Sequence, residues 1–236
     1  MTEVSRRRRL AAPPLRPERV ERVMGRLALE IDGMALPAVE KISEQHAEDP
    51  FRILIGTLLS ARTQDATTHA ASTRLFRVAR TARTMAALPV KRIERLIYPV
   101  SFYRNKARFV RATCEVLVER FGGRVPRTLD ELVQLPGVGR KTANLVLILA
   151  FQSRQNICVD THVHRISNRM GWVRTREPNE TEQALYAATD ERWWPYINLY
   201  LVTWGQNVCR PIYPRCGACA IASECPRIGV LKIGKT

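Results

Sequence analysis

The apolar residues of this chain recur at helical spacing, and no segment alternates convincingly between apolar and polar residues as a half-buried strand would. Val20, Val23 and Leu27, for example, share one face of a segment that turns helical from Glu18. The run FRILIGTLLSA, residues 51–61, is apolar nearly all round and predicts a central core helix. The spacing therefore predicts an all-α fold.

Residues that favour helix ends support this interpretation. Asp49 is a capping acid and Pro50 suits the first position of a helix, so a helix is expected to begin directly after Asp49. The segment 101–123 reads as a long amphipathic helix, and Gly122 is placed to end it.

The chain is strongly basic. Lys and Arg outnumber Asp and Glu by 38 to 22, which gives a formal charge of +16 that is not confined to the run Arg6–Arg9. Such a charge favours a polyanionic partner, nucleic acid first, although a solvated basic surface is the alternative. Residues 1–17 combine arginines with prolines and are expected to form a disordered basic arm.

Two further features narrow the class of protein. No apolar run approaches the roughly 18 residues that a membrane span needs. The N-terminal arginines are not followed by the apolar segment of a secretory signal. We therefore expect no membrane partner and a reducing, cytoplasmic location, near the nucleoid if the source is bacterial. In that location the six cysteines should not form disulfides.

The stretch LPGVGRKTA, residues 135–143, lies between two predicted helices. Thr128 and Glu131 form a T-x-x-E capping box that opens a short helix through Gln134. A second helix is expected over residues 140–151. The arrangement predicts a helix–hairpin–helix, for which an ordinary helix–helix turn is the alternative.

The glycines and lysine of this stretch suggest a phosphate-binding loop, but a P-loop needs glycine directly before lysine, and Arg140 separates Gly139 from Lys141. Pro136 stops the first helix, while Gly137 and Gly139 allow positive φ and a close approach of the backbone to a partner. Unpaired amides at the start of the second helix can then hold an anion. A DNA phosphate fits this site, and such a contact does not depend on base sequence.

Four cysteines follow the pattern C-x6-C-x2-C-x5-C within 17 residues: Cys209, Cys216, Cys219 and Cys225. Structural zinc sites usually combine two C-x2-C-like pairs, and only one such pair is present. So compact a set of thiolates suits an iron–sulfur cluster, although ligand type alone does not exclude zinc. The other two cysteines, Cys114 and Cys158, lie in apolar surroundings and are expected in the core.

Together these motifs resemble one known group. The capped helix, LPGVG and RKTANLVL resemble the helix-hairpin-helix of the Gly/Pro-Asp DNA glycosylase superfamily, and VDTHVHR with Asp160 resembles its invariant-aspartate segment. The cysteine spacing matches the 4Fe-4S loop of endonuclease III and its adenine-glycosylase relatives. Those adenine-specific relatives generally lack a lysine at the position of Lys141, so the chain is most similar to endonuclease III, over roughly residues 18–226.

The resemblance implies a bifunctional DNA glycosylase and abasic-site lyase that removes oxidised pyrimidines from duplex DNA. It implies that Lys141 is the nucleophile that forms a Schiff base with the sugar. Burial beside cations such as Arg140 would favour loss of its proton. Asp160 can stabilise positive charge on the sugar or move a proton, and capping a helix is its alternative role. The cofactor implied is a structural 4Fe-4S cluster on the four cysteines.

Two predicted DNA contacts depart from the family pattern. Arg62 in LLSARTQD replaces a glutamine that fills the hole left by the flipped base, which puts the choice of lesion in doubt. Phe102 in SFYRNKA replaces a leucine wedge, and a ring can stack between bases. The full set of predicted DNA contacts is Arg62, Phe102, Pro136, Gly137, Val138, Gly139, Arg140, His162, Arg210 and Arg215. Packing or solvation is the alternative for Phe102, His162 and the last two arginines.

The expected architecture has two helical lobes with a DNA groove between them. Residues 43–153 form a six-helix lobe with the hairpin, residues 18–42 join 154–226 in a cluster lobe, and 227–236 form a tail. A monomer is expected. Two other functions remain open: a monofunctional mismatch glycosylase, and a non-catalytic iron–sulfur sensor of DNA damage.

Overall fold

The computed structural model describes residues 17–45 and 49–234, and within them every regular element is a helix. The all-α prediction is therefore confirmed. The expected basic arm lies outside the described residues, apart from Pro17. No helix in the described part of the chain is long and apolar enough to cross a membrane.

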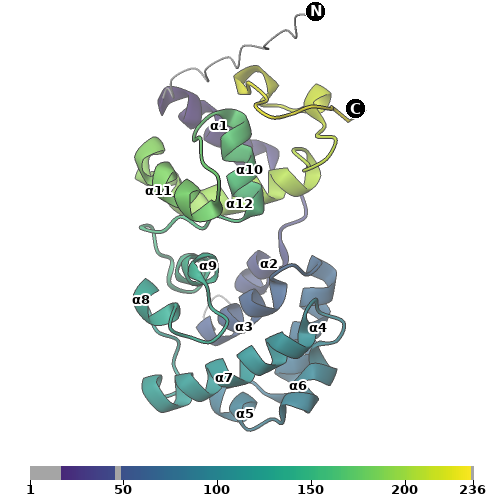
Figure 1. The fold of residues 1–236 in the computed structure, drawn as a ribbon, viewed down its shortest axis with the longest axis vertical. Coiled ribbons are helices and arrows are strands. Elements are labelled where there is room, and N and C mark those ends of the chain that lie inside the picture. Colours follow the sequence, from purple (N-terminus) through teal and green to yellow (C-terminus); the bar gives the residue numbers. More distant parts are fainter. Residues whose placement is uncertain (1–16, 46–48, 235–236) are drawn as a thin grey trace, which may run out of the picture.

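Figure 1 shows two groups of helices along the long axis of the molecule. In chain order the α-helices are α1 (Pro17–Glu30), α2 (Ala38–Gln45), α3 (Pro50–Ser60), α4 (Asp65–Val78), α5 (Ala82–Ala86), α6 (Val90–Ile97), α7 (Tyr103–Phe121), α8 (Leu129–Leu132), α9 (Arg140–Phe151), α10 (Thr161–Met170), α11 (Pro178–Ala188) and α12 (Trp194–Asn207). Short 3-10 turns cover Glu191–Trp193, Cys216–Ala218 and Ala222–Glu224.

Several predicted helix ends are confirmed. The Asp49 carboxylate accepts a hydrogen bond from the amide of Arg52, which caps α3 as expected. Gly122 adopts the left-handed conformation, with φ 60°, and ends α7. The Thr128 hydroxyl accepts from the amide of Glu131 at the start of α8.

Two predicted bounds are wrong. The long helix starts at Tyr103 rather than at residue 101, because Phe102 has φ 56° and cannot continue an α-helix. The short helix ends at Leu132 rather than Gln134, because the chain turns there and buries Leu135 in the core.

The buried apolar residues form two main clusters. One is built from α3 to α9, and the other joins α1 to α10, α11 and α12. A small third cluster of Val39, Leu145, Ile148 and Cys158 includes residues from α2 and α9. The predicted boundary between residues 42 and 43 falls inside α2, which contacts α3, α4 and α9. In Figure 1, α9 lies on the side of its group that faces α11 and α12, and Arg140 at its start pairs with Glu182 of α11.

Candidate active site

The loop between α8 and α9 is held by its apolar residues. Leu135 and Val138 are buried, and the carbonyl oxygen of Pro136 accepts a 2.7 Å hydrogen bond from the Thr113 hydroxyl. Gly137 has φ 79° and lies so close to Phe109 that an added Cβ would meet the ring at 2.8 Å. Only glycine combines this φ with this contact without strain.

No side chain caps the N-terminus of α9, where Gly139 is the N-cap residue in an extended conformation. The first-turn amides therefore face outward with the positive end of the helix dipole. Gly137 and Gly139 are both exposed beside them. The geometry of this loop suits an anion such as a DNA phosphate.

Lys141 is exposed on the first turn of α9. Within the described part of the chain, no hydrogen bond or ion pair occupies its ammonium. Its backbone carbonyl accepts a 3.5 Å hydrogen bond from the thiol of Cys158, which ties the segment before α10 to α9. Asp160 follows two residues later, so the tie brings Lys141 and Asp160 to the same junction.

Asp160 is the N-cap of α10, as one of its two predicted roles requires. Its Oδ1 accepts hydrogen bonds of 2.8 Å from the amides of His162 and Val163. The other carboxylate oxygen, Oδ2, accepts no hydrogen bond from any described residue. Capping therefore uses one oxygen and leaves the second available for a substrate.

His162 and Arg140 have protein partners. Burial lowers the pKa of His162, whose Nδ1 lies 3.0 Å from the Arg165 guanidinium. Arg140 forms a bidentate pair with the buried carboxylate of Glu182 on α11, with Nε–Oε1 at 2.9 Å and Nη2–Oε1 at 2.8 Å. The hydrogen bond that Arg140 donates to this carboxylate raises the pKa of Arg140. The positive charge of Arg140 was expected to favour loss of the Lys141 proton. In the structure the Glu182 carboxylate pairs with this charge.

A carboxyl that the sequence did not single out lies nearby. Glu40 on α2 is only 6% exposed, and burial raises the pKa of its carboxyl to about 7. The charges of Lys141 and Asp160 also act on this pKa, in opposite directions, so all three groups share one neighbourhood. A glutamate in a short amphipathic helix gives no local signal of burial, so only the packing reveals it.

Arg62 and Phe102 are exposed, and both have positive φ, 54° and 56°. They line one hollow together with Gly137 of the hairpin loop. The structure therefore brings both predicted wedge residues to the hairpin, whereas Arg210 and Arg215 lie exposed in the cysteine loop.

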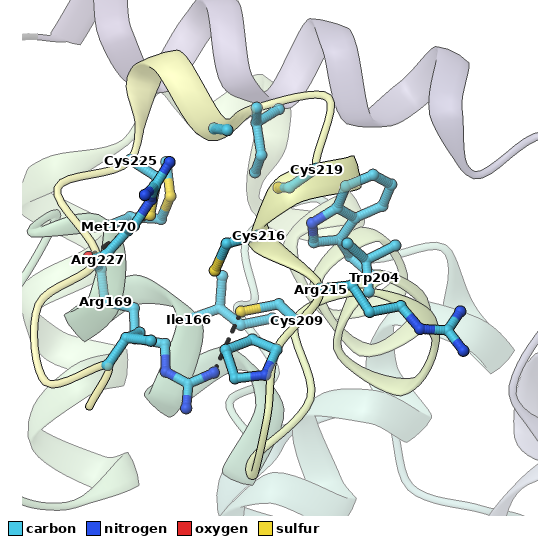
Figure 2. A pocket seen from close by; sticks show the side chains of 15 residues that line it. Ile166, Arg169, Met170, Trp204, Cys209, Arg215, Cys216, Cys219, Cys225 and Arg227 are labelled. Carbon is cyan, nitrogen blue, oxygen red and sulfur yellow. Dashed lines mark hydrogen bonds between the residues drawn. The ribbon is translucent and has the colours of Figure 1, made fainter. Parts of the chain in front are cut away.

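The four clustered cysteines line a single cavity after α12. Figure 2 shows their sulfur atoms around a common space. All six cysteines are free thiols, and Cys114 and Cys158 are fully buried as predicted. Across residues 17–45 and 49–234, no group of three or more His, Cys, Asp or Glu side chains could hold a metal ion.

Two donors border the same cavity. Arg169 donates a 3.4 Å hydrogen bond from Nη1 to the sulfur of Cys209 (Figure 2). The indole Nε1 of Trp204 is buried near the Cys219 thiol, but among the described residues it makes no hydrogen bond of normal geometry. A buried N–H that is poorly paired is uncommon, and an acceptor bound in the cavity would satisfy it.

Comparison with known proteins relates the chain to one group. Residues 55–191 match the model of the HhH-GPD superfamily base excision DNA repair protein. The chain is 46% identical over 196 residues to endonuclease III of Thermotoga maritima, covering 83% of this chain and 92% of that protein.

Two solved structures of endonuclease III with DNA have a similar fold. A non-covalent complex has a TM-score of 0.81 at 33% identity and covers 90% of this chain and 96% of that one. A trapped covalent intermediate with an estranged adenine has a TM-score of 0.80 at 32% identity, with coverages of 90% and 97%.

Proposed function

Because this chain belongs to the endonuclease III family of base-excision DNA glycosylases and abasic-site lyases, we propose that Lys141 is its nucleophile and Asp160 its acid–base partner. The observation that carries the proposal is that the segment before α10 is tied to the first turn of α9, which brings the two residues together. Among the described residues, nothing pairs with the Lys141 ammonium, and nothing donates a hydrogen bond to Oδ2 of Asp160. Combined glycosylase and lyase chemistry needs such a pair, because the leaving base creates positive charge on the sugar and the amine forms the covalent intermediate from which the strand is cut.

The proposed reaction starts when the damaged nucleotide leaves the stack, since its C1′ is inaccessible inside a duplex. The free amine of Lys141 bonds to C1′ as the bond from C1′ to the base breaks, and the base keeps the electron pair and takes a proton from water. Asp160 accepts one of the two amine protons, which leaves a neutral secondary amine on C1′. Asp160 then returns this proton to O4′ as the C1′–O4′ bond breaks, the ring opens and the C1′–N bond becomes an iminium.

The iminium acidifies the proton on C2′. The Asp160 carboxylate accepts this proton, the C–H electron pair forms a C2′–C3′ double bond, and the 3′ phosphate leaves with the electron pair of the C3′–O bond, which cuts the strand. Water hydrolyses the Schiff base and restores the Lys141 amine. The hairpin amides at the N-terminus of α9 support this sequence of steps by holding a backbone phosphate while the sugar moves.

Oxidised pyrimidines in duplex DNA are the proposed substrate class. The proposal is supported by the similarity to endonuclease III over most of both chains. The basic composition, +16 over the chain, suits duplex DNA as the partner. We also propose that the protein acts as a monomer in the cytoplasm, near the nucleoid if the source is bacterial.

Borohydride trapping tests the role of Lys141. Wild-type protein incubated with duplex DNA that holds an abasic site or thymine glycol should form a covalent adduct when borohydride is added, because the reagent reduces the imine. Lys141→Gln should form none. Lys91→Gln is the matched control, since Lys91 is an exposed lysine on α6, and it should trap DNA as well as wild type does.

The same assay separates the alternatives. Base release without any adduct would indicate a monofunctional glycosylase, and binding without base release would indicate a non-catalytic sensor. An undiminished adduct with Lys141→Gln would overturn the assignment of the nucleophile.

We further propose that Cys209, Cys216, Cys219 and Cys225 hold a 4Fe-4S cluster. The support is that all four thiols line one cavity, although no three of them are grouped to hold a single ion. The buried N–H of Trp204 and the guanidinium of Arg169 would donate hydrogen bonds to the sulfur atoms of the cluster or of its cysteine ligands. When bound, the cluster cross-links the loop that carries Arg210 and Arg215, and it can exchange an electron.

Metal analysis tests the cluster. The protein purified without oxygen should be yellow-brown and contain about four iron and four sulfide per chain. Cys219→Ser should lose most of the visible absorption, whereas Cys114→Ala, in the core away from the loop, should keep it. A colourless protein with one zinc per chain would contradict the proposal.

A further inference from the structure

Arg62 and Phe102 share an unusual backbone conformation. Both lie in the left-handed region, with φ 54° and 56°, although neither is glycine. Phe102 is 61% exposed, so burial of its own ring does not hold it there. A residue in this region costs on the order of 1–3 kcal/mol and persists only where its surroundings determine it. The surroundings of both residues therefore need an explanation.

Lys106 provides the first restraint. Its ammonium is nearly buried and donates hydrogen bonds to the carbonyl oxygens of Leu59, at 2.7 Å, and Ala61, at 2.5 Å. It also donates to the Thr63 hydroxyl at 3.0 Å. The first two acceptors lie at the C-terminal end of α3, where a cation is favoured. These three bonds hold the chain on both sides of Arg62.

Thr63 provides the second restraint. Its hydroxyl oxygen also accepts a 3.2 Å hydrogen bond from the amide of Ser101, the residue before Phe102. Lys106 lies on the first turn of α7, and its amide donates to the carbonyl oxygen of Phe102. One hydroxyl and one ammonium thus connect the two loops that carry the strained residues.

A hollow lies beside these two loops, and the residues that line it indicate a use for the hydrogen bonds that join the loops. Arg62, Phe102 and Lys106 line it together with Phe109 and Gly137 of the hairpin contact. The hairpin loop, which we propose to hold a DNA phosphate, therefore borders the hollow that the two exposed side chains line. A duplex held by its backbone at the hairpin would bring a gap in its stack to Arg62 and Phe102.

We propose that Thr63 and Lys106 are positioning residues that hold Arg62 and Phe102 as one rigid pair for insertion into damaged duplex DNA. The inference rests on the proposed function, because it assumes that a nucleotide leaves the stack. The guanidinium and the ring fill the vacated space, and holding them in place beforehand removes the cost of ordering two loops on binding. Thr63 and Lys106 touch neither the sugar nor the base.

Affinity for two duplexes tests the proposal without catalysis. One duplex contains a tetrahydrofuran abasic analogue opposite 2-aminopurine, and the other is undamaged. Thr63→Val removes the shared acceptor, and Thr63→Ser is the matched control that retains it. We expect Thr63→Val to lower affinity for the tetrahydrofuran duplex about tenfold, close to the loss of one base-stacking contact. Its affinity for undamaged duplex should not change, since that binding uses phosphates.

The fluorescence of 2-aminopurine reports insertion directly, because its brightness depends on which groups stack on the base. Wild type and Thr63→Ser should change its brightness on binding, and Thr63→Val should do so much less. If the Lys106→Met variant folds, it should behave like Thr63→Val. If it does not fold, the comparison of Thr63→Val with Thr63→Ser tests the proposal. The inference would be overturned if Thr63→Val kept the wild-type preference for the tetrahydrofuran duplex over the undamaged duplex, including the case in which it lost affinity for both duplexes equally. Borohydride trapping at Lys141 reports separately on the proposed function.

Discussion

At the scale of single residues, Glu40 has the most informative environment. Burial raises the pKa of its carboxyl from 4.5 to about 7, so the folded protein binds this proton more tightly than the unfolded chain does. The resulting stabilisation is complete below about pH 4.5 and is lost as pH rises through 7. Glu40→Gln, which stays neutral, should therefore exceed wild type in unfolding free energy at pH 8 by up to about 3 kcal/mol.

Urea unfolding at pH 5 and pH 8 measures this difference, which should nearly vanish at the lower pH. Glu44→Gln, on the exposed side of the same helix, is the control and should not alter the pH dependence. An equal gain at both pH values would show that Glu40 does not titrate as its burial implies.

At the scale of elements, the loop between α8 and α9 depends on two glycines for different reasons. Gly137 needs positive φ, and an added Cβ would meet Phe109 at 2.8 Å. Gly139 has φ −89° and nothing within 4 Å of an added Cβ. Gly137→Ala should lower the unfolding free energy by about 1–3 kcal/mol, through backbone strain and the clash. Gly139→Ala should change it by less than about 0.5 kcal/mol.

Chemical denaturation of the two variants beside wild type measures the contrast. Similar losses in both variants would mean that the loop rearranges freely and that its packing on Phe109 does not position it.

At the scale of the whole molecule, the pair of Arg140 and Glu182 joins α9 to α11 across the two groups of helices (Figure 1). The Glu182 side chain is 3% exposed, so removing Arg140 leaves a buried carboxylate without its partner. Removing one partner of a buried ion pair can lower the unfolding free energy by several kcal/mol, but the Arg140 side chain is 42% exposed and solvent screens part of the interaction. We expect Arg140→Ala to lower the unfolding free energy by about 1–3 kcal/mol.

A double-mutant cycle with Glu182→Gln measures the coupling. The cost of Arg140→Ala should fall by at least about 1 kcal/mol in the Glu182→Gln background, because no uncompensated charge remains. Additive losses would mean that the pair does not connect the two groups of helices energetically.

The sequence by itself determined the all-helical class, the hairpin between α8 and α9, and the family. Each depends on local information: apolar spacing, capping residues such as Asp49 and Thr128, and a proline beside glycines. Sequence spacing also brought the four cysteines into one short loop, and the structure places them around one cavity.

The tertiary structure decided what depends on residues distant in sequence. The burial of Glu40, the partner of Arg140 and the bond from Ser101 to Thr63 each join segments that no local pattern relates. The late start of α7 coincides with such a contact, since Ser101, directly before the left-handed Phe102, donates its amide to the distant Thr63. Helical periodicity reports which face is apolar, whereas the charge and strain of a single side chain depend on the element packed against it.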